Sequence, residues 1–159
     1  MLIYEGIFFD KDTIKLIHSL EENQLEKADE LLHCTFKFRP KPNEIFNDIV
    51  GKEYELFLIG YANDGKNSGL EILLPDELKK YYLNNEEDNP KQLKTPHITA
   101  SFAYNAIPKD TKDLSFKPLK EPIKITGKFG YFIGTRQNSY LSFKPYFKKN
   151  TYKYYNIFN

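Results

Sequence analysis

The stretches LLHCTFKF (31–38) and TPHITASF (95–102) repeat one pattern, and they decide the expected fold. Each reads His, one uncharged residue, Thr, another such residue, a polar residue and then Phe. Runs that alternate in this way are typical of strands with one buried face. The repetition therefore predicts two similar strands, far apart in the chain, that present the same side chains.

Strand alternation places the polar and apolar side chains of both stretches on opposite faces. The apolar face carries Phe36 in the first stretch and Ile98 in the second, and it is expected to pack on helices. The other face is expected to form the floor of a polar cleft. Its members would be His33, Thr35 and Lys37 from the first stretch, and His97, Thr99 and Ser101 from the second.

The rest of the chain predicts an α+β fold with mainly antiparallel strands. Helical spacing of apolar residues follows Asp10 and Pro75, and the segment 63–69 is rich in turn formers that would close a hairpin. The polar segment 84–94 is predicted to be a surface loop. Further strands are expected at 2–9, 54–62, 70–74, 122–134 and 139–147.

Composition favours a single domain over residues 1–159, because 40% of the residues are hydrophobic and no linker interrupts the chain. One cysteine and no long apolar run favour a reducing, cytoplasmic location without a membrane span. No obligate protein partner is evident. The net charge is +1, but Glu121 is the only acidic residue after Asp113. This basic last third fits either a phosphate-bearing ligand or a solvated lysine surface.

Two imidazoles in one cleft suit general acid–base chemistry, since histidine titrates near neutral pH. One ring would take a proton from the attacking water or hydroxyl, and the other would protonate the leaving oxygen. The hydroxyls of Thr35 and Thr99 would hold the phosphoryl oxygens. This scheme requires no metal and no other cofactor.

Other interpretations of these residues are weaker. A single His-x-Thr is common in ordinary strands, and only its repetition favours function. A zinc site would need His18 as a third imidazole, but His18 lies in a helical stretch and no closely spaced ligand pair exists. Cys34 is expected to pack as a small apolar residue rather than act as a nucleophile.

The paired motifs HCTF (33–36) and HITA (97–100) resemble those of the two-histidine (2H) phosphoesterase superfamily. That superfamily includes bacterial RNA 2′,3′-cyclic phosphodiesterases, the cyclic phosphodiesterase domain of fungal tRNA ligases, and viral enzymes that degrade 2′,5′-oligoadenylate or cyclic oligonucleotides. YEGIFFD (4–10) resembles the first strand of the family. Family members usually carry an aliphatic residue after the motif threonine, where this chain has Phe36 and Ala100.

The resemblance implies a bilobal fold of two antiparallel sheets, related by pseudo-two-fold symmetry around a cleft, with helices outside. It implies a hydrolase that cleaves RNA or nucleotide phosphodiesters, including 2′,3′-cyclic, 2′,5′ and cyclic oligonucleotide linkages. His33 and His97 would be acid and base. A non-catalytic RNA- or nucleotide-binding module and a protein-interaction domain are the alternatives. The expected substrate contacts are Tyr4, Lys37, Ser101 and Tyr104, and the alternative for Tyr4, which is slightly favoured, is a core aromatic.

Overall fold

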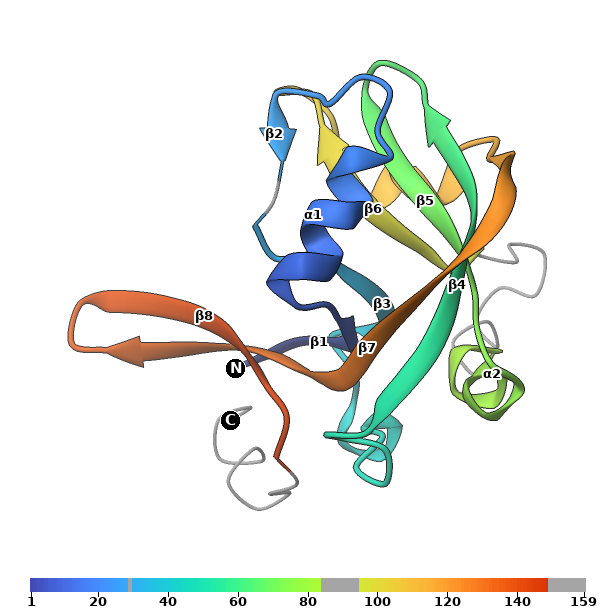
Figure 1. Ribbon diagram of the computed structural model, residues 1–159. Coiled ribbons are helices and arrows are strands. Elements are labelled where there is room, and N and C mark those ends of the chain that lie inside the picture. The colour runs from blue at the N-terminus through green and yellow to red at the C-terminus, as the bar shows by residue number, and fades with distance from the viewer. Residues whose placement is uncertain (29, 84–94, 149–159) are drawn as a thin grey trace.

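The computed structural model describes residues 1–28, 30–83 and 95–148, and Figure 1 shows the arrangement of their helices and strands. The loop predicted at 84–94 lies outside the described residues. Within the described part, the predicted α+β class is confirmed: antiparallel strands dominate, and two α-helices accompany them.

All the described strands join into one antiparallel sheet. Its order is β2-β6-β5-β4-β7-β1-β3, with β8 paired to β7. The expected division into two sheets therefore stays a prediction. The strands are β1 (Leu2–Phe8), β2 (Lys27–Ala28), β3 (His33–Phe38), β4 (Glu53–Asn63), β5 (Asn67–Leu73), β6 (His97–Phe102), β7 (Lys117–Gln137) and β8 (Tyr140–Tyr146).

The helices are short. Helix α1 (Lys11–Ser19) is capped at its N-terminus by Asp10, whose carboxylate accepts a 2.8 Å hydrogen bond from the backbone N–H of Thr13. Helix α2 is Asp76–Leu83, and 3-10 helices cover Pro42–Glu44 (η1) and Pro108–Asp113 (η2). None of the described helices has the length and apolar character needed to cross a membrane.

The hydrophobic core lies against one face of the sheet. Across three neighbouring strands, Ile7 in β1 pairs with Cys34 in β3 and with Phe129 in β7, and all three side chains are completely buried. The predicted packing of Cys34 as a buried apolar residue is confirmed. Helix α2 adds Tyr82, whose ring meets that of Phe36 edge-on. Burial of this apolar area is the main term that favours the fold.

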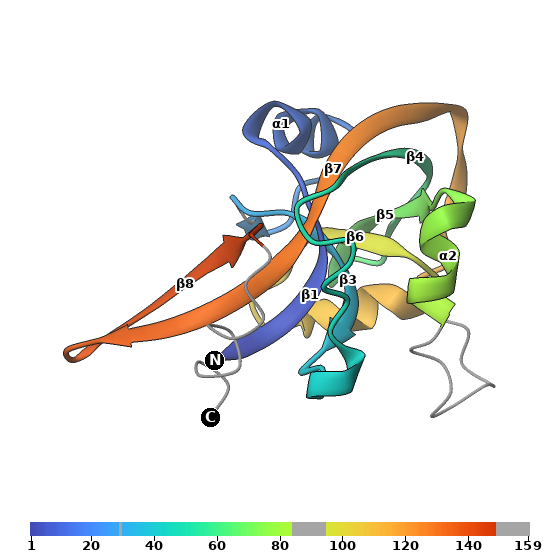
Figure 2. The same cartoon turned by 90° about the horizontal axis from the view of Figure 1, so that it is seen from below.

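The sheet curls so that strands near the two ends of its path meet. Strand β3 ends the path and β6 lies near the other end, yet the two strands are in contact. Figures 1 and 2 show them side by side from two directions. This curl brings together the two strands that carry the repeated pattern.

Strand β7 is the longest element and links the parts of the sheet. It pairs with β4 along its first half, with β1 along its middle and with β8 at its end. The hairpin of β7 and β8 projects away from the rest of the molecule (Figure 1).

Candidate functional site

The two His-x-Thr segments lie next to each other. Strands β3 and β6 are in contact, and the backbone of His97 in β6 lies beside the Cys34 thiol in β3, next to His33. The positive charge of His97 also lowers the pKa of His33, so the two imidazoles lie within electrostatic reach of each other. The structure therefore brings His33 and His97, which lie far apart in sequence, to one place.

A glycine faces the threonine of each segment. Gly6 in β1 pairs with Thr35, and Gly69 in β5 pairs with Thr99. A Cβ atom at Gly6 would lie 2.1 Å from the carbonyl oxygen of Cys34, the residue between His33 and Thr35. The equivalent atom at Gly69 would lie 2.7 Å from the carbonyl oxygen of Ile98. Both contacts are closer than a side chain allows, so each motif strand depends on a glycine opposite its threonine.

A shift of register follows each threonine. In the β1–β3 ladder, Thr35 pairs with Gly6 but Lys37 pairs with Glu5, so Phe36 is an extra residue. In the β5–β6 ladder, Ala100 is extra in the same way, between Thr99 and Ser101. An extra residue reverses the alternation of every side chain beyond it.

These bulges correct the predicted cleft face. His33 and Thr35 share one face, as do His97 and Thr99, but Lys37 and Ser101 turn to the core side. The Lys37 Nζ lies 2.7 Å from Oε2 of Glu44. Ser101 is completely buried, and its hydroxyl donates to Glu21 and accepts a 3.0 Å hydrogen bond from the backbone of Leu25. Simple alternation failed here because each bulge adds one residue.

His33 is half-buried and held by Tyr4. The Tyr4 hydroxyl oxygen lies 3.1 Å from Nδ1 of His33, and the two rings stack with their centroids 4.5 Å apart. The pKa of His33 is lowered to about 4, mainly by burial and in addition by the charge of His97. A hydrogen bond to the Leu31 carbonyl acts in the opposite direction. His33 is therefore neutral at physiological pH.

A backbone carbonyl fixes the His97 ring. Its Nδ1 lies 2.8 Å from the carbonyl oxygen of Thr95, two residues earlier. His33 makes the equivalent hydrogen bond to the carbonyl of Leu31, which is also two residues earlier. A carbonyl can only accept, so Nδ1 of His97 carries a proton and donates it. The Nε2 atom is consequently the one that can exchange a proton with a ligand.

The two threonines differ in their hydrogen bonds. The Thr99 hydroxyl lies 3.1 Å from the Pro108 carbonyl oxygen and 2.9 Å from Oγ1 of Thr111, so it anchors η2 to β6. Asn67 also donates to Thr111, at 3.0 Å. Within the described residues, the Thr35 hydroxyl has no such partner. The two hydroxyls are therefore not equally available to a ligand.

The tyrosines named from the sequence lie in contrasting places. Tyr4 is 8% exposed, and its ring lies between His33 on β3 and Phe132 on β7. That position leaves no face of the ring for a nucleobase, so Tyr4 positions His33 instead. Tyr104 lies beyond the end of β6, is 71% exposed, and has the Lys27 ammonium 4.9 Å from its ring centre.

Three residues that shape this site carry no distinctive signal in the local sequence. Gly6 and Gly69 look like ordinary strand residues until their partner strands are known. Each lies in the strand before the α-helix that precedes its motif. Phe132 stacks on Tyr4, with 4.8 Å between ring centroids, only because β1 pairs with β7, which no local pattern indicates.

Among the described residues, no group of three His, Cys, Asp or Glu side chains is placed to hold a metal ion.

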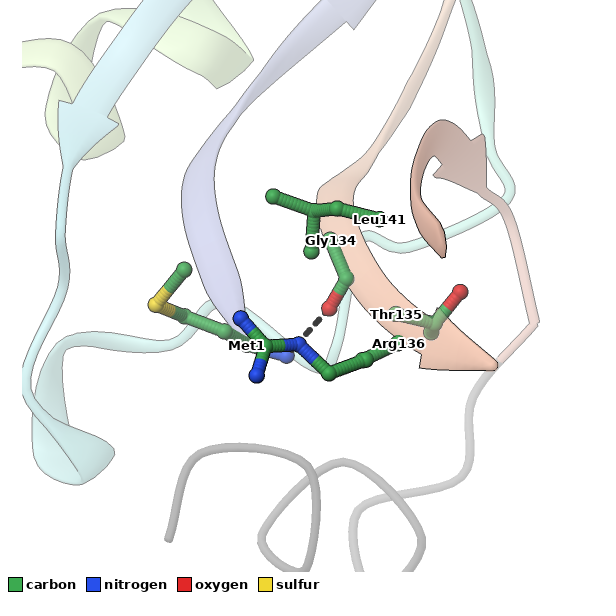
Figure 3. A pocket seen from close by; sticks show the side chains of 5 residues that line it. All are labelled: Met1, Gly134, Thr135, Arg136 and Leu141. Atoms are coloured by element: carbon green, nitrogen blue, oxygen red, sulfur yellow. Dashed lines mark hydrogen bonds between the residues drawn. The ribbon is translucent and has the colours of Figure 1, made fainter. Parts of the chain in front are cut away.

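A separate hollow lies along the β7–β8 hairpin, on the part nearer its turn. It is lined by Met1, Gly134, Thr135, Arg136 and Leu141, as Figure 3 shows. The Met1 ammonium donates a 2.6 Å hydrogen bond to the Gly134 carbonyl at its floor.

No protein-family model and no curated protein sequence matches the chain.

Proposed function

We propose that the protein is a phosphodiesterase that hydrolyses RNA or nucleotide phosphodiesters, with His33 and His97 as the acid–base pair. The observation that carries this proposal is that β3 and β6 are in contact, which brings His33 and His97 near enough for the charge of one to lower the pKa of the other. Each is followed, two residues later, by a threonine on the same face. Two such imidazoles match the two proton transfers that displacement at phosphorus requires.

We assign the roles in the hydrolytic direction from the lowered pKa of His33. His33 is the neutral ring, so it accepts the proton of the attacking water. A new bond forms between phosphorus and the water oxygen. The bond to the leaving oxygen breaks, and His97 donates its Nε2 proton to that oxygen. The proton that His33 gained and the one that His97 lost are exchanged with solvent after the products leave.

Donors for the phosphoryl oxygens are available on the same face. The Thr35 hydroxyl is placed to donate directly, while Thr99 must turn its proton away from η2 to do so. A bound phosphodiester is negative, so it would raise the pKa of both imidazoles and strengthen His33 as a base. Neither proton transfer needs a metal ion.

The repeated local geometry also supports the bilobal 2H arrangement as part of this proposal. Both motif strands pair antiparallel with the strand before the preceding α-helix. Both have glycine opposite threonine and one extra residue after it. A common ancestral unit, used twice around one cleft, accounts for these shared features.

A hydrolysis panel in EDTA tests the proposal. The substrates would be a 2′,3′-cyclic mononucleotide, RNA ending in a 2′,3′-cyclic phosphate, 2′,5′-oligoadenylate and cyclic dinucleotides, with products identified by mass. We expect turnover of at least one, and a loss of about 10²–10⁴ in kcat for His33→Ala and for His97→Ala. Circular dichroism would check that both variants fold. Near wild-type turnover by either variant would contradict the proposal.

A non-catalytic nucleotide-binding module is the second candidate. It is favoured by the Thr99 hydroxyl, which is already engaged by η2 rather than poised for a ligand. That candidate predicts binding of labelled RNA with affinity that falls steeply as salt rises, but no product from any substrate in the panel.

A further inference from the structure

The face of the sheet that carries His33 continues onto the β7–β8 hairpin. Tyr4 pairs with Phe132, and Gly134 pairs with Phe143. By strand alternation, Phe132, Gly134 and Arg136 share this face on β7, and Leu141 and Phe143 share it on β8. We call these five residues the hairpin face.

Stacked rings connect His33 to the hairpin face without a break. The ring of Tyr4 stacks on His33 at 4.5 Å, Phe132 on Tyr4 at 4.8 Å, and Phe143 on Phe132 at 6.0 Å between centroids. The angles between successive planes are 28°, 16° and 11°. Phe143, the outermost ring, is 47% exposed. The row therefore ends in an aromatic surface open to solvent.

Gly134 sets the position of that last ring. A Cβ atom there would lie 2.8 Å from Cε1 of Phe143, so the ring covers the backbone of β7 where no side chain stands. An aromatic ring over a cross-strand glycine is held in place by the strand itself. Phe143 is thus exposed yet packed over the strand, which suits a platform for stacking.

Charge on the hairpin favours an anionic ligand. Residues 122–148 contain no aspartate or glutamate. Arg136 is exposed, and it lines the hollow beside Leu141 (Figure 3). A guanidinium that shares a sheet face with a stacking ring suits single-stranded nucleic acids, since the ring takes a base and the cation takes a phosphate.

We propose that the hairpin face binds the nucleotides that flank the scissile phosphate of a single-stranded RNA substrate. A base would stack on Phe143, and a phosphate would lie at Arg136. The proposal rests on the phosphodiesterase function above, and it makes an oligonucleotide, rather than a lone cyclic nucleotide, the preferred substrate. Base stacking of this kind tolerates any sequence.

Binding to a labelled RNA tests this surface directly. The probe would be a fluorescein-labelled oligouridine of about twelve nucleotides, long enough to cover a typical single-strand site. Fluorescence anisotropy would be measured in EDTA with the His97→Ala background, which prevents cleavage. We expect Phe143→Ala and Arg136→Ala each to weaken binding about tenfold, which is within the range measured for lost base stacking and phosphate contacts.

The opposite side of the same hairpin supplies matched controls. Tyr140 and Lys144 pair with Gln137 and Ile133, so they face away from Phe143. Tyr140→Ala and Lys144→Ala remove one aromatic ring and one cation, and we expect affinity to stay within about twofold. Equal losses in all four variants would show only nonspecific attraction and would overturn the proposal.

Two further measurements separate stacking from structural effects. Phe143→Leu keeps apolar packing over Gly134 but removes the ring, so it should lose RNA affinity as Phe143→Ala does. Retained affinity in a folded Phe143→Leu protein would contradict stacking. Sedimentation would show whether Phe143→Ala breaks up a dimer; if it does so without changing RNA affinity, the surface serves self-association and the proposal fails.

Turnover distinguishes this proposal from the one on which it rests. In the wild-type background, Phe143→Ala should raise KM for oligonucleotide cleavage but leave kcat/KM for a 2′,3′-cyclic mononucleotide unchanged. Equal effects on both substrates would mean that Phe143 acts through the ring row on His33 and would contradict a binding role. If wild-type protein cleaves neither substrate, the phosphodiesterase proposal fails, while the anisotropy result still decides whether the hairpin face binds RNA.

Discussion

The Tyr4 hydroxyl oxygen lies 3.1 Å from Nδ1 of His33, and the ring of Tyr4 stacks on the same imidazole. One residue of β1 thus fixes both the plane and one nitrogen of a histidine on β3. The Leu31 carbonyl can only accept, so one ring nitrogen of His33 is a donor and the other nitrogen of the neutral ring can accept a proton from water. Tyr4 is therefore a positioning residue in our account.

Replacing Tyr4 by phenylalanine should separate these two effects. Tyr4→Phe keeps the stacked ring but removes the hydroxyl from Nδ1. We expect kcat to fall about tenfold with little change in thermal stability, because the imidazole loses orientation but not packing. The pH dependence of kcat should also move, which a merely structural role would not produce.

Tyr61→Phe is the matched control for this change. The Tyr61 hydroxyl lies 3.2 Å from Ser68 Oγ, away from either histidine, so its loss should leave the pH profile unchanged. Equal shifts of the profile in both variants would argue against a specific role for Tyr4.

The coupling between the two histidines should be visible by NMR. The pKa of His33 is lowered to about 4, first by burial and then by the charge of His97. In His97→Gln the charge is gone but the burial remains, so the pKa of His33 should rise and still stay below the ordinary value of 6.5. Titration of the imidazole carbon-bound protons in both proteins measures this. An unchanged pKa of His33 would mean that the rings do not share a site.

Glu5 should make the protein less stable as pH rises. Its side chain is completely buried, and Oε1 has no hydrogen-bond partner among the described residues. Burial raises the pKa of Glu5 to about 8, opposed mainly by the hydrogen bond from the Phe46 N–H. Between pH 4.5 and about 8, the unfolded chain loses a proton that the folded protein keeps, so the free energy of unfolding falls as pH increases.

Glu5→Gln should remove this fall in the free energy of unfolding with rising pH. The amide oxygen can still accept from Phe46, and no buried charge forms. With about 1.4 kcal/mol per pKa unit, the variant should gain on the order of 4 kcal/mol relative to wild type between pH 4.5 and 8. Urea unfolding at both pH values measures the difference. The exposed Glu53→Gln is the control, and a parallel pH dependence of wild type and Glu5→Gln would contradict the assignment.

Gly6 should not tolerate even a methyl group. An added Cβ lies 2.1 Å from the Cys34 carbonyl oxygen, which is backbone and cannot rotate away. We expect Gly6→Ala to lower the free energy of unfolding by at least about 1–3 kcal/mol, the usual range for overpacking. Gly65→Asn is the control, because Gly65 has a φ of 84° but open space around its Cβ position. A Gly6→Ala protein as stable as wild type would show that the close pairing with Thr35 is not needed.

The sequence predicted the parts of the site that depend on local alternation. His33 with Thr35 and His97 with Thr99 needed only a regular strand over three residues. Lys37 and Ser101 required the strands to stay regular for two residues more, and the extra residues Phe36 and Ala100 reversed them. A bulge depends on the partner strand, so neither reversal is visible in the motif itself. Gly6 and Gly69 lie opposite the two threonines, and the closeness of that pairing shows only once the partner strands are known.

Long-range pairing decided the rest. Most strands were predicted within a few residues, but β7 begins at Lys117 and ends at Gln137, longer than the run at 122–134 indicated. Its length allows β4, β1 and β8 to pair along one strand, which joins all described strands into one sheet. The row of rings from His33 to Phe143 exists only because of that pairing, so periodicity could not reveal it.

A double-variant cycle of turnover tests the central claim most directly, using whichever substrate of the panel is cleaved. Two imidazoles that act on one phosphorus work as a unit, so removing both should harm little more than removing one. We predict that His33→Ala and His97→Ala each lower kcat by about 10²–10⁴. The kcat of the double variant should lie within about tenfold of the kcat of the less active single variant. Losses that multiply in the double variant, or a single variant with wild-type turnover, would contradict the account.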